Sequence, residues 1–122
     1  MAKFATAEQL LTKPARTKEQ VLSLGDAEVK VKLRAIGSKA YDDLLAEHPP
    51  TKAQKAEQAT YNMDTFAPEL LSMCMVDPEL TLIQCQDLWT NPEWSRGELL
   101  DLFFSAVEIN NKGLNVPSNA PA

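Results

Sequence analysis

With 122 residues, the chain is long enough for one domain with a modest hydrophobic core and too short for two. Hydrophobic residues make up 44% and charged residues 24%, a composition that excludes a fibrous or fully disordered protein. The net charge of −5 is uneven, because residues 1–60 carry ten Lys/Arg and eight Asp/Glu, whereas residues 61–122 carry two and nine. The acidic second half argues against nucleic-acid binding, since phosphate contacts need clustered cations.

Neither the cysteines nor the histidine forms a metal-binding pattern. Cys74 and Cys85 lie among apolar residues without CxxC or Cys/His spacing, and His48 is the only histidine. We therefore expect no metal site and two reduced, buried thiols. A disulfide is the alternative, and it would require an oxidising compartment.

No segment has the features of a membrane or export signal. The N-terminal stretch MAKFATAEQLLTK lacks the roughly 7–15-residue apolar run of a signal peptide. Nowhere does the sequence approach the ~20 consecutive apolar residues of a membrane span. A cytosolic protein without a membrane partner is therefore expected.

Residues 1–20 are expected to form a loosely ordered N-terminal arm. Its large apolar side chains, which favour a short helical turn, are Phe4, Leu10 and Leu11. Pro14 should end that turn, because proline lacks the amide that a helix needs.

Residues 21–35 are predicted to form a β-hairpin. In the second strand, apolar residues alternate strictly with charged ones, as in a half-buried strand. The expected inward face is Val29, Val31 and Leu33. Gly25-Asp26 supplies the turn, since Gly tolerates positive φ.

A helix follows from Ser38, whose hydroxyl can serve as the N-cap, to His48, where two prolines end it. The polar segment 51–60 has no large apolar residue and is expected to be a linker or a solvated helical turn. Beyond it, three further helices are predicted over about residues 64–76, 79–89 and 95–110. Ser95 and Glu98 have the spacing of a capping box at the start of the last one.

Together these elements predict a mainly α fold. We expect a small bundle of four or so helices with a short N-terminal β-hairpin, so that the chain is α+β with helices dominant. The domain should span residues 21–113, after the arm at 1–20. The tail, residues 114–122, contains two prolines and no periodicity and is expected to be disordered.

The polar residues form no catalytic pattern. General acid–base catalysis needs convergent polar groups in a cleft, whereas the carboxylates here are spread over predicted solvent faces. Asp42 and Asp43 are adjacent and would point to different sides of a helix, and Ser95 has no neighbouring base. Phosphate-binding, dinucleotide-binding and hydrolase motifs are not found in the sequence. We therefore expect no enzyme, no catalytic residue and no cofactor.

The last predicted helix has more apolar surface than a small core needs. In LLDLFFSAVEI, residues 99–109, apolar side chains cover more than half of the circumference, whereas a core-facing stripe takes roughly 100°. Two interpretations stay open: a buried central helix, or a helix that also offers a face to a partner. For the second, the partner-binding residues would be Leu99, Leu102, Phe103, Phe104 and Ile109, with Trp89 and Trp94 as rim or anchor residues.

The order of segments over residues 21–114 resembles the tail assembly chaperones of long-tailed, siphovirus-type bacteriophages. A strand pair, LSLGDAEVKVKLRAI, leads into an acidic helix, SKAYDDLLAE, and a variable polar stretch. The block ELLSMCMVDPEL is similar to the family's hydrophobic helix, which ends in a Cys-containing, Val-x-Pro-type break. The turn WTNPEWSRGE and the helix LLDLFFSAVEINNKG resemble the family's closing segment.

This resemblance implies a phage protein made in the host cytoplasm that binds the tape measure protein and keeps it soluble while the tail tube polymerises. It also implies absence from the mature virion and a longer product made by ribosomal frameshifting. The tail-tube subunit and a second copy of the chain are further candidate partners. No catalytic residue is implied.

Two other functions stay open. One is a structural head–tail connector or minor tail protein, which would remain in the virion and assemble through ring contacts. The other is a small cytosolic helical adaptor. Chaperones and structural components both need exposed apolar surface, so the sequence alone does not separate them.

Overall fold

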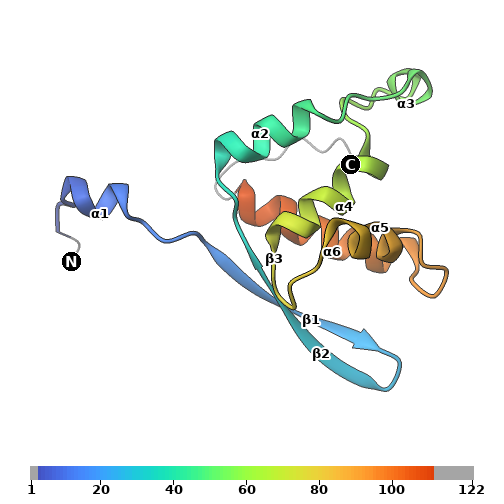
Figure 1. Cartoon of the computed structure of the whole chain (residues 1–122), viewed down its shortest axis with the longest axis horizontal. Coiled ribbons are helices and arrows are strands. Elements are labelled where there is room, and N and C mark those ends of the chain that lie inside the picture. Colours follow the sequence, from blue (N-terminus) through green and yellow to red (C-terminus); the bar gives the residue numbers. More distant parts are fainter. Residues whose placement is uncertain (1–2, 112–122) are drawn as a thin grey trace.

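The computed structural model describes residues 3–111, which form an α+β domain with six helices and one antiparallel sheet of order β1-β2-β3 (Figure 1). The strands are β1 (Thr17–Leu24), β2 (Ala27–Arg34) and β3 (Met75–Asp77). The helices are α1 (Ala7–Leu11), α2 (Ser38–Ala46), α3 (Lys52–Ala56), α4 (Met63–Cys74), α5 (Leu82–Trp89) and α6 (Arg96–Asn110).

The prediction of a mainly α bundle is wrong, because the structure contains a third strand, β3, that joins the hairpin in one sheet. The helix expected to run to residue 76 ends at Cys74, and the next three residues pair with β2, with Met75 opposite Leu33. Residues 70–76 are apolar nearly all round, a pattern shared by a buried helix and a buried strand. The position before Pro78 disfavours helical backbone, and the free edge of β2 provides the hydrogen-bonding partner.

The hairpin is confirmed, but it begins earlier than predicted. β1 starts at Thr17, so residues 17–20 belong to the sheet and the arm is shorter than the predicted 1–20. Their polar sequence, TKEQ, lacks the alternation of a half-buried strand. They form a strand because β2 lies opposite them: Thr17 pairs with Arg34 at one end of the hairpin, and Leu24 pairs with Ala27 at the other. Gly25, at φ +63°, makes the predicted turn.

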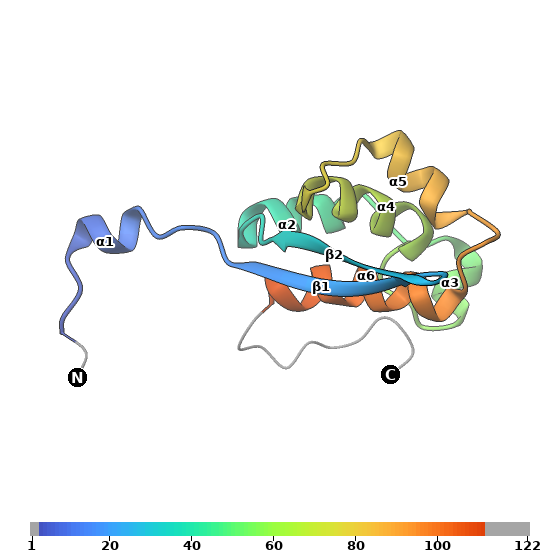
Figure 2. The ribbon, with the colours of Figure 1, turned by 90° about the horizontal axis from the view of Figure 1, so that it is seen from below.

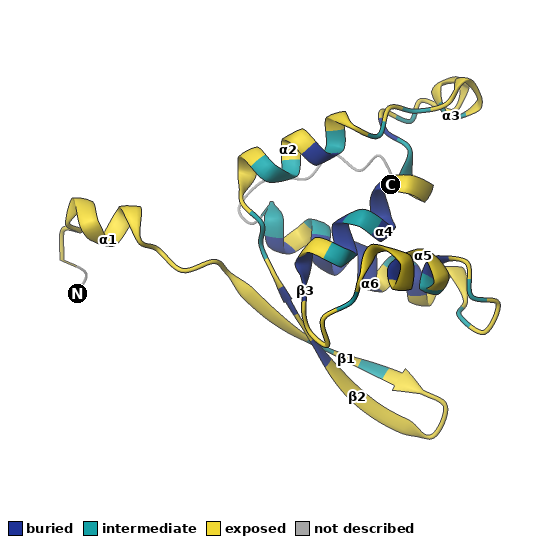
Figure 3. Ribbon diagram, viewed as in Figure 1, coloured by how far each residue is buried: buried dark blue, intermediate teal, exposed yellow. Residues whose placement is uncertain are grey.

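One face of the sheet is covered by α6, against which α4 packs. Val31 and Leu33 are buried beneath them as predicted, whereas Val29 is exposed because the tip of the hairpin extends beyond the core. Figure 2 shows α6 running along the hairpin, and α4 packs against both α5 and α6. In Figure 3 the buried residues gather on α4, α6 and the middle of β2. The other face of the sheet carries exposed charges, including the ion pair Lys30–Glu19 at 3.5 Å.

The start of α2 differs from the prediction, and the structure of segment 51–60 decides between the two predicted alternatives. The N-cap of α2 is Gly37, at φ +96°, with no side-chain hydrogen bond, so Ser38 is the first helical residue and not the cap. The polar segment 51–60 contains α3, whose capping box joins Thr51 and Gln54, and it is therefore the solvated helical turn.

The N-terminal arm, residues 3–16, stands away from the rest of the domain (Figure 1). It contains the predicted helical turn, α1, which a capping box between Thr6 and Gln9 begins and which ends at Leu11, before Pro14. Every residue from 3 to 19 is exposed. The predicted disordered tail, residues 114–122, lies outside the described residues.

Candidate functional site

The position where α6 begins is set by its own first turn. The Ser95 hydroxyl accepts a hydrogen bond from the Glu98 amide at 3.2 Å, and the Ser95 amide donates to the Glu98 carboxylate at 2.9 Å. This is the capping box that the sequence predicted. The Ser95 amide and hydroxyl also hold the pKa of the Glu98 carboxyl below its usual value.

We expect Ser95→Ala to lower the free energy of unfolding by about 1 kcal/mol, since the helix loses a side-chain cap. The pKa of Glu98 is lowered in the folded state, so the ionised carboxylate stabilises the fold at neutral pH. This stabilisation is lost as the pH falls through the lowered pKa. Urea unfolding at several pH values measures both. Thr6→Ala removes the same cap from the exposed arm and should leave the unfolding midpoint unchanged; an equal loss in the two variants would contradict the prediction.

Most residues predicted to bind a partner are core residues. The inward face of α6 is Leu99, Leu102, Phe103, Ala106 and Ile109, all buried. The Phe103 ring meets Phe66 edge-on with centroids 5.9 Å apart and Trp89 at 6.0 Å. The prediction that Leu99, Leu102, Phe103 and Ile109 bind a partner is therefore corrected. They fill the space between the sheet and α4, as in the first of the two interpretations of this helix.

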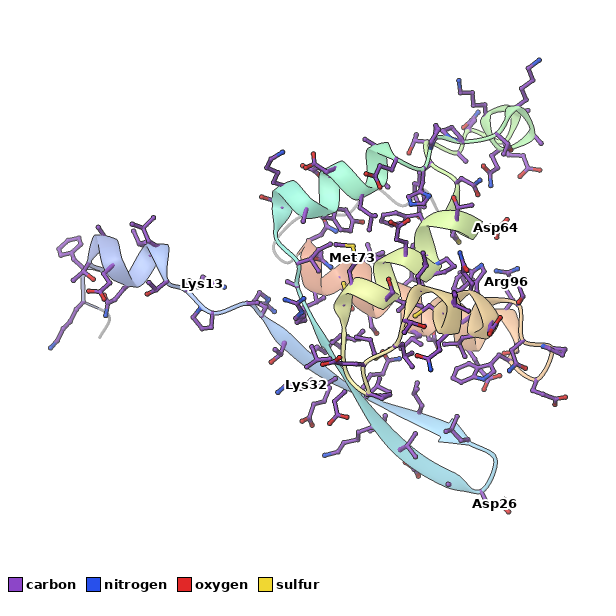
Figure 4. All side chains as sticks on the ribbon, viewed as in Figure 1. Lys13, Asp26, Lys32, Asp64, Met73 and Arg96 are labelled. Carbon is purple, nitrogen blue, oxygen red and sulfur yellow. The ribbon has the colours of Figure 1, made fainter. Side chains whose placement is uncertain are left out.

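The two tryptophans occupy different environments at one end of the domain. Trp89 is buried, with Arg96 stacked 5.4 Å from its ring and its indole N–H 3.5 Å from the carboxylate of Asp64. Figure 4 shows Arg96 and Asp64 together at this end. Trp94 is half-buried and lines, with Trp89, an open hollow of about 420 Å³. Trp94 thus retains accessible surface, whereas Trp89 is a core residue.

The exposed apolar surface of α6 is a second stripe, which we call the outer stripe: Leu100, Phe104 and Val107. Phe104 is 37% exposed and the other two are half-buried. Their i, i+4, i+7 spacing puts them on one line along the helix. Exposed Asp101 and Glu108 lie along one side of this line, and Glu108 also pairs with Lys18 at 3.2 Å.

Phe104 was among the residues predicted to bind a partner, whereas Leu100 and Val107 were not. The signal was present, because an apolar arc wider than one core stripe can be divided into two stripes of helical spacing. The sequence could not show which of the two stripes faces the sheet.

One polar cluster was not predicted from the sequence. His48 has Nδ1 2.8 Å from the Thr65 hydroxyl and Nε2 2.7 Å from the Glu69 carboxylate. Glu47, His48 and Glu69 each offer one ligand atom, and these three atoms lie within 4.8 Å of one another. Among the described residues, this arrangement comes nearest to a metal-ligand set. Both ring nitrogens already contact protein groups, so the geometry fits a polar link that fastens the end of α2 to α4.

The cysteines match the prediction of buried thiols. Cys74 and Cys85 are both free and buried, and burial raises the pKa of each thiol. Cys74 Sγ also accepts a hydrogen bond from the Asn110 side chain at 3.4 Å. Raised pKa values disfavour the thiolate, so neither group has the character of a nucleophile.

Comparison with known proteins does not place this fold or its sites in a family. No family model, no curated protein and no solved structure matches the chain. Among the described residues, no helix combines the length and the apolar character needed to traverse a lipid bilayer.

Proposed function

We propose that the protein is a tail assembly chaperone of a long-tailed bacteriophage, which binds the tape measure protein in the host cytoplasm during tail-tube assembly. The observation that carries the proposal is the outer stripe of α6, an apolar line that the protein's own core covers only in part, with Phe104 exposed and Leu100 and Val107 half-buried. The resemblance of the sequence to this family, from the hairpin to the closing helix, supports the same function.

The outer stripe has the form of a docking site for another helix. A client helix with apolar residues at i, i+3 or i+4, and i+7 can lie along Leu100, Phe104 and Val107. The carboxylates of Asp101 and Glu108 would favour Lys or Arg beside the client's apolar residues. A long amphipathic helix, which is what the resemblance implies for the tape measure protein, offers this pattern repeatedly.

The small size of the stripe agrees with a chaperone that must release its client. One partly exposed Phe and two half-buried aliphatic residues can bury only a modest area per contact. Weak contacts dissociate quickly, so the tail-tube subunits could replace the chaperone along the client. Several copies on one long client would together shield its apolar face.

The N-terminal arm favours a second candidate function. An exposed arm with large apolar side chains is a means of joining neighbouring subunits, as a ring-forming connector or minor tail protein requires. Such a protein would remain in the particle.

Immunoblotting separates the two functions. An antibody to this chain is used on lysate late in infection and on purified particles, with the tail-tube subunit as loading control. The chaperone should give a band in lysate that is missing from particles. A band retained in particles would contradict the proposal and support the structural component.

A further inference from the structure

The N-terminal arm exposes apolar side chains to an extent that the domain itself does not explain. Phe4 is 103% exposed, Leu10 71% and Leu11 85%, all close to the exposure in an unfolded chain. Their helix, α1, has five residues, and helices this short are unstable in water unless another surface packs against them. The arm therefore has the properties of a segment that folds on a partner.

The backbone directs the arm away from its own domain. The Arg16 carbonyl still accepts a hydrogen bond from the Ala35 amide at 2.8 Å, so sheet pairing fixes the chain up to this residue. Pro14 has a fixed φ, and it restricts Lys13 to extended backbone. Lys13 and α1 accordingly stand out beyond the end of the sheet (Figure 4). To reach its own outer stripe, the chain would have to reverse at these stiff positions.

The charges of the arm complement those beside the outer stripe. The arm, residues 3–16, carries three cations and one acid: Lys3, Lys13, Arg16 and Glu8. Of the exposed acids of α6, Asp101 and Glu108 lie beside the outer stripe, and Glu108 also pairs with Lys18. The arm thus combines large apolar side chains with cations before and after its short helix, which is the class of ligand proposed above for the outer stripe.

We propose that the arm of one copy docks on the outer stripe of a second copy, with Phe4, Leu10 and Leu11 covering Phe104. The contact joins two different surfaces, so copies associate head to tail. One part of this inference rests on the proposed function: a client helix competes with the arm for the same stripe. Self-association then covers the client-binding surface until a client displaces the arm.

Complementation between two variants tests the head-to-tail contact. Leu10→Asp disables the arm and Phe104→Asp disables the outer stripe, and each should weaken self-association by at least about tenfold in sedimentation equilibrium. In an equal mixture, the Phe104→Asp chain supplies an intact arm and the Leu10→Asp chain an intact stripe. The two variants should therefore form heterodimers and nothing larger. Ile83→Asp, which places the same charge on an exposed residue of α5, should associate like the wild type.

Three results would overturn the inference: a wild-type chain that stays monomeric at all concentrations, Leu10→Asp that associates like the wild type, or a mixture that stays monomeric. A monomeric wild type whose Leu10→Asp variant binds client more tightly would show that the arm folds back on its own stripe. If Phe104→Asp does not fold, Phe104→Ala replaces it. Binding of the tape measure protein is measured separately, so a chain that self-associates without binding it would refute only the proposed function.

Discussion

Phe103→Ala is expected to lower the free energy of unfolding by about 3–5 kcal/mol, the usual cost of truncating a buried Phe. The side chain is fully buried, and its ring makes edge-on contacts with Phe66 and Trp89 at centroid distances of 5.9 and 6.0 Å. Removal leaves a cavity where α4, α5 and α6 meet and breaks these two contacts as well as a tilted one with Phe104 at 5.5 Å. Since small domains have only about 5–15 kcal/mol of stability in total, the variant should unfold at clearly lower urea concentration.

The neighbouring phenylalanine is the matched control for this prediction. Phe104→Ala removes the same atoms from the same helix, but the side chain is 37% exposed and lies on the outer stripe. We expect it to cost about 1–2 kcal/mol, because less apolar area returns to water and solvent fills the gap. Equal costs for the two variants would contradict the assignment of Phe103 to the core and Phe104 to the surface.

If the protein has the proposed chaperone function, Phe104→Asp is expected to weaken binding of the tape measure protein by about 30-fold, the effect of losing one interface hot spot worth about 2 kcal/mol. The substitution removes the most exposed apolar side chain of the outer stripe and adds a third carboxylate between Asp101 and Glu108. Co-expression with the tape measure protein of the same genome gives a direct measurement. The client should be soluble and should co-purify with the wild-type chain, and it should precipitate with the variant.

Two controls make this experiment decisive. Ile83→Asp places a carboxylate on an apolar residue that is 69% exposed on α5, away from the outer stripe, and it should keep binding within about twofold. Circular dichroism must show that Phe104→Asp retains the helix content of the wild type. If the folded variant still keeps the client soluble, the outer stripe is not the client-binding surface.

Local interactions could be predicted well from the sequence. The capping box of Ser95 and Glu98, the turn at Gly25 and the end of α1 before Pro14 each depend on residues within four positions of one another. The length of α6 and the burial of the two cysteines follow from apolar patterns in the same way. Neighbouring residues are sufficient for the capping box and the turn, whereas for the cysteines the apolar pattern predicts burial without specifying what covers them.

The sequence alone, then, determined the hairpin turn, the capping box at the start of α6 and an apolar arc on the last helix too wide for one core stripe. Tertiary structure decided that Met75 pairs with Leu33, that Thr17 already belongs to a strand and that His48 meets Glu69. It also decided which part of the arc is core and which is the outer stripe. These outcomes depend on partners far apart in the sequence, and apolar periodicity specifies that a face will be buried but not which surface will cover it.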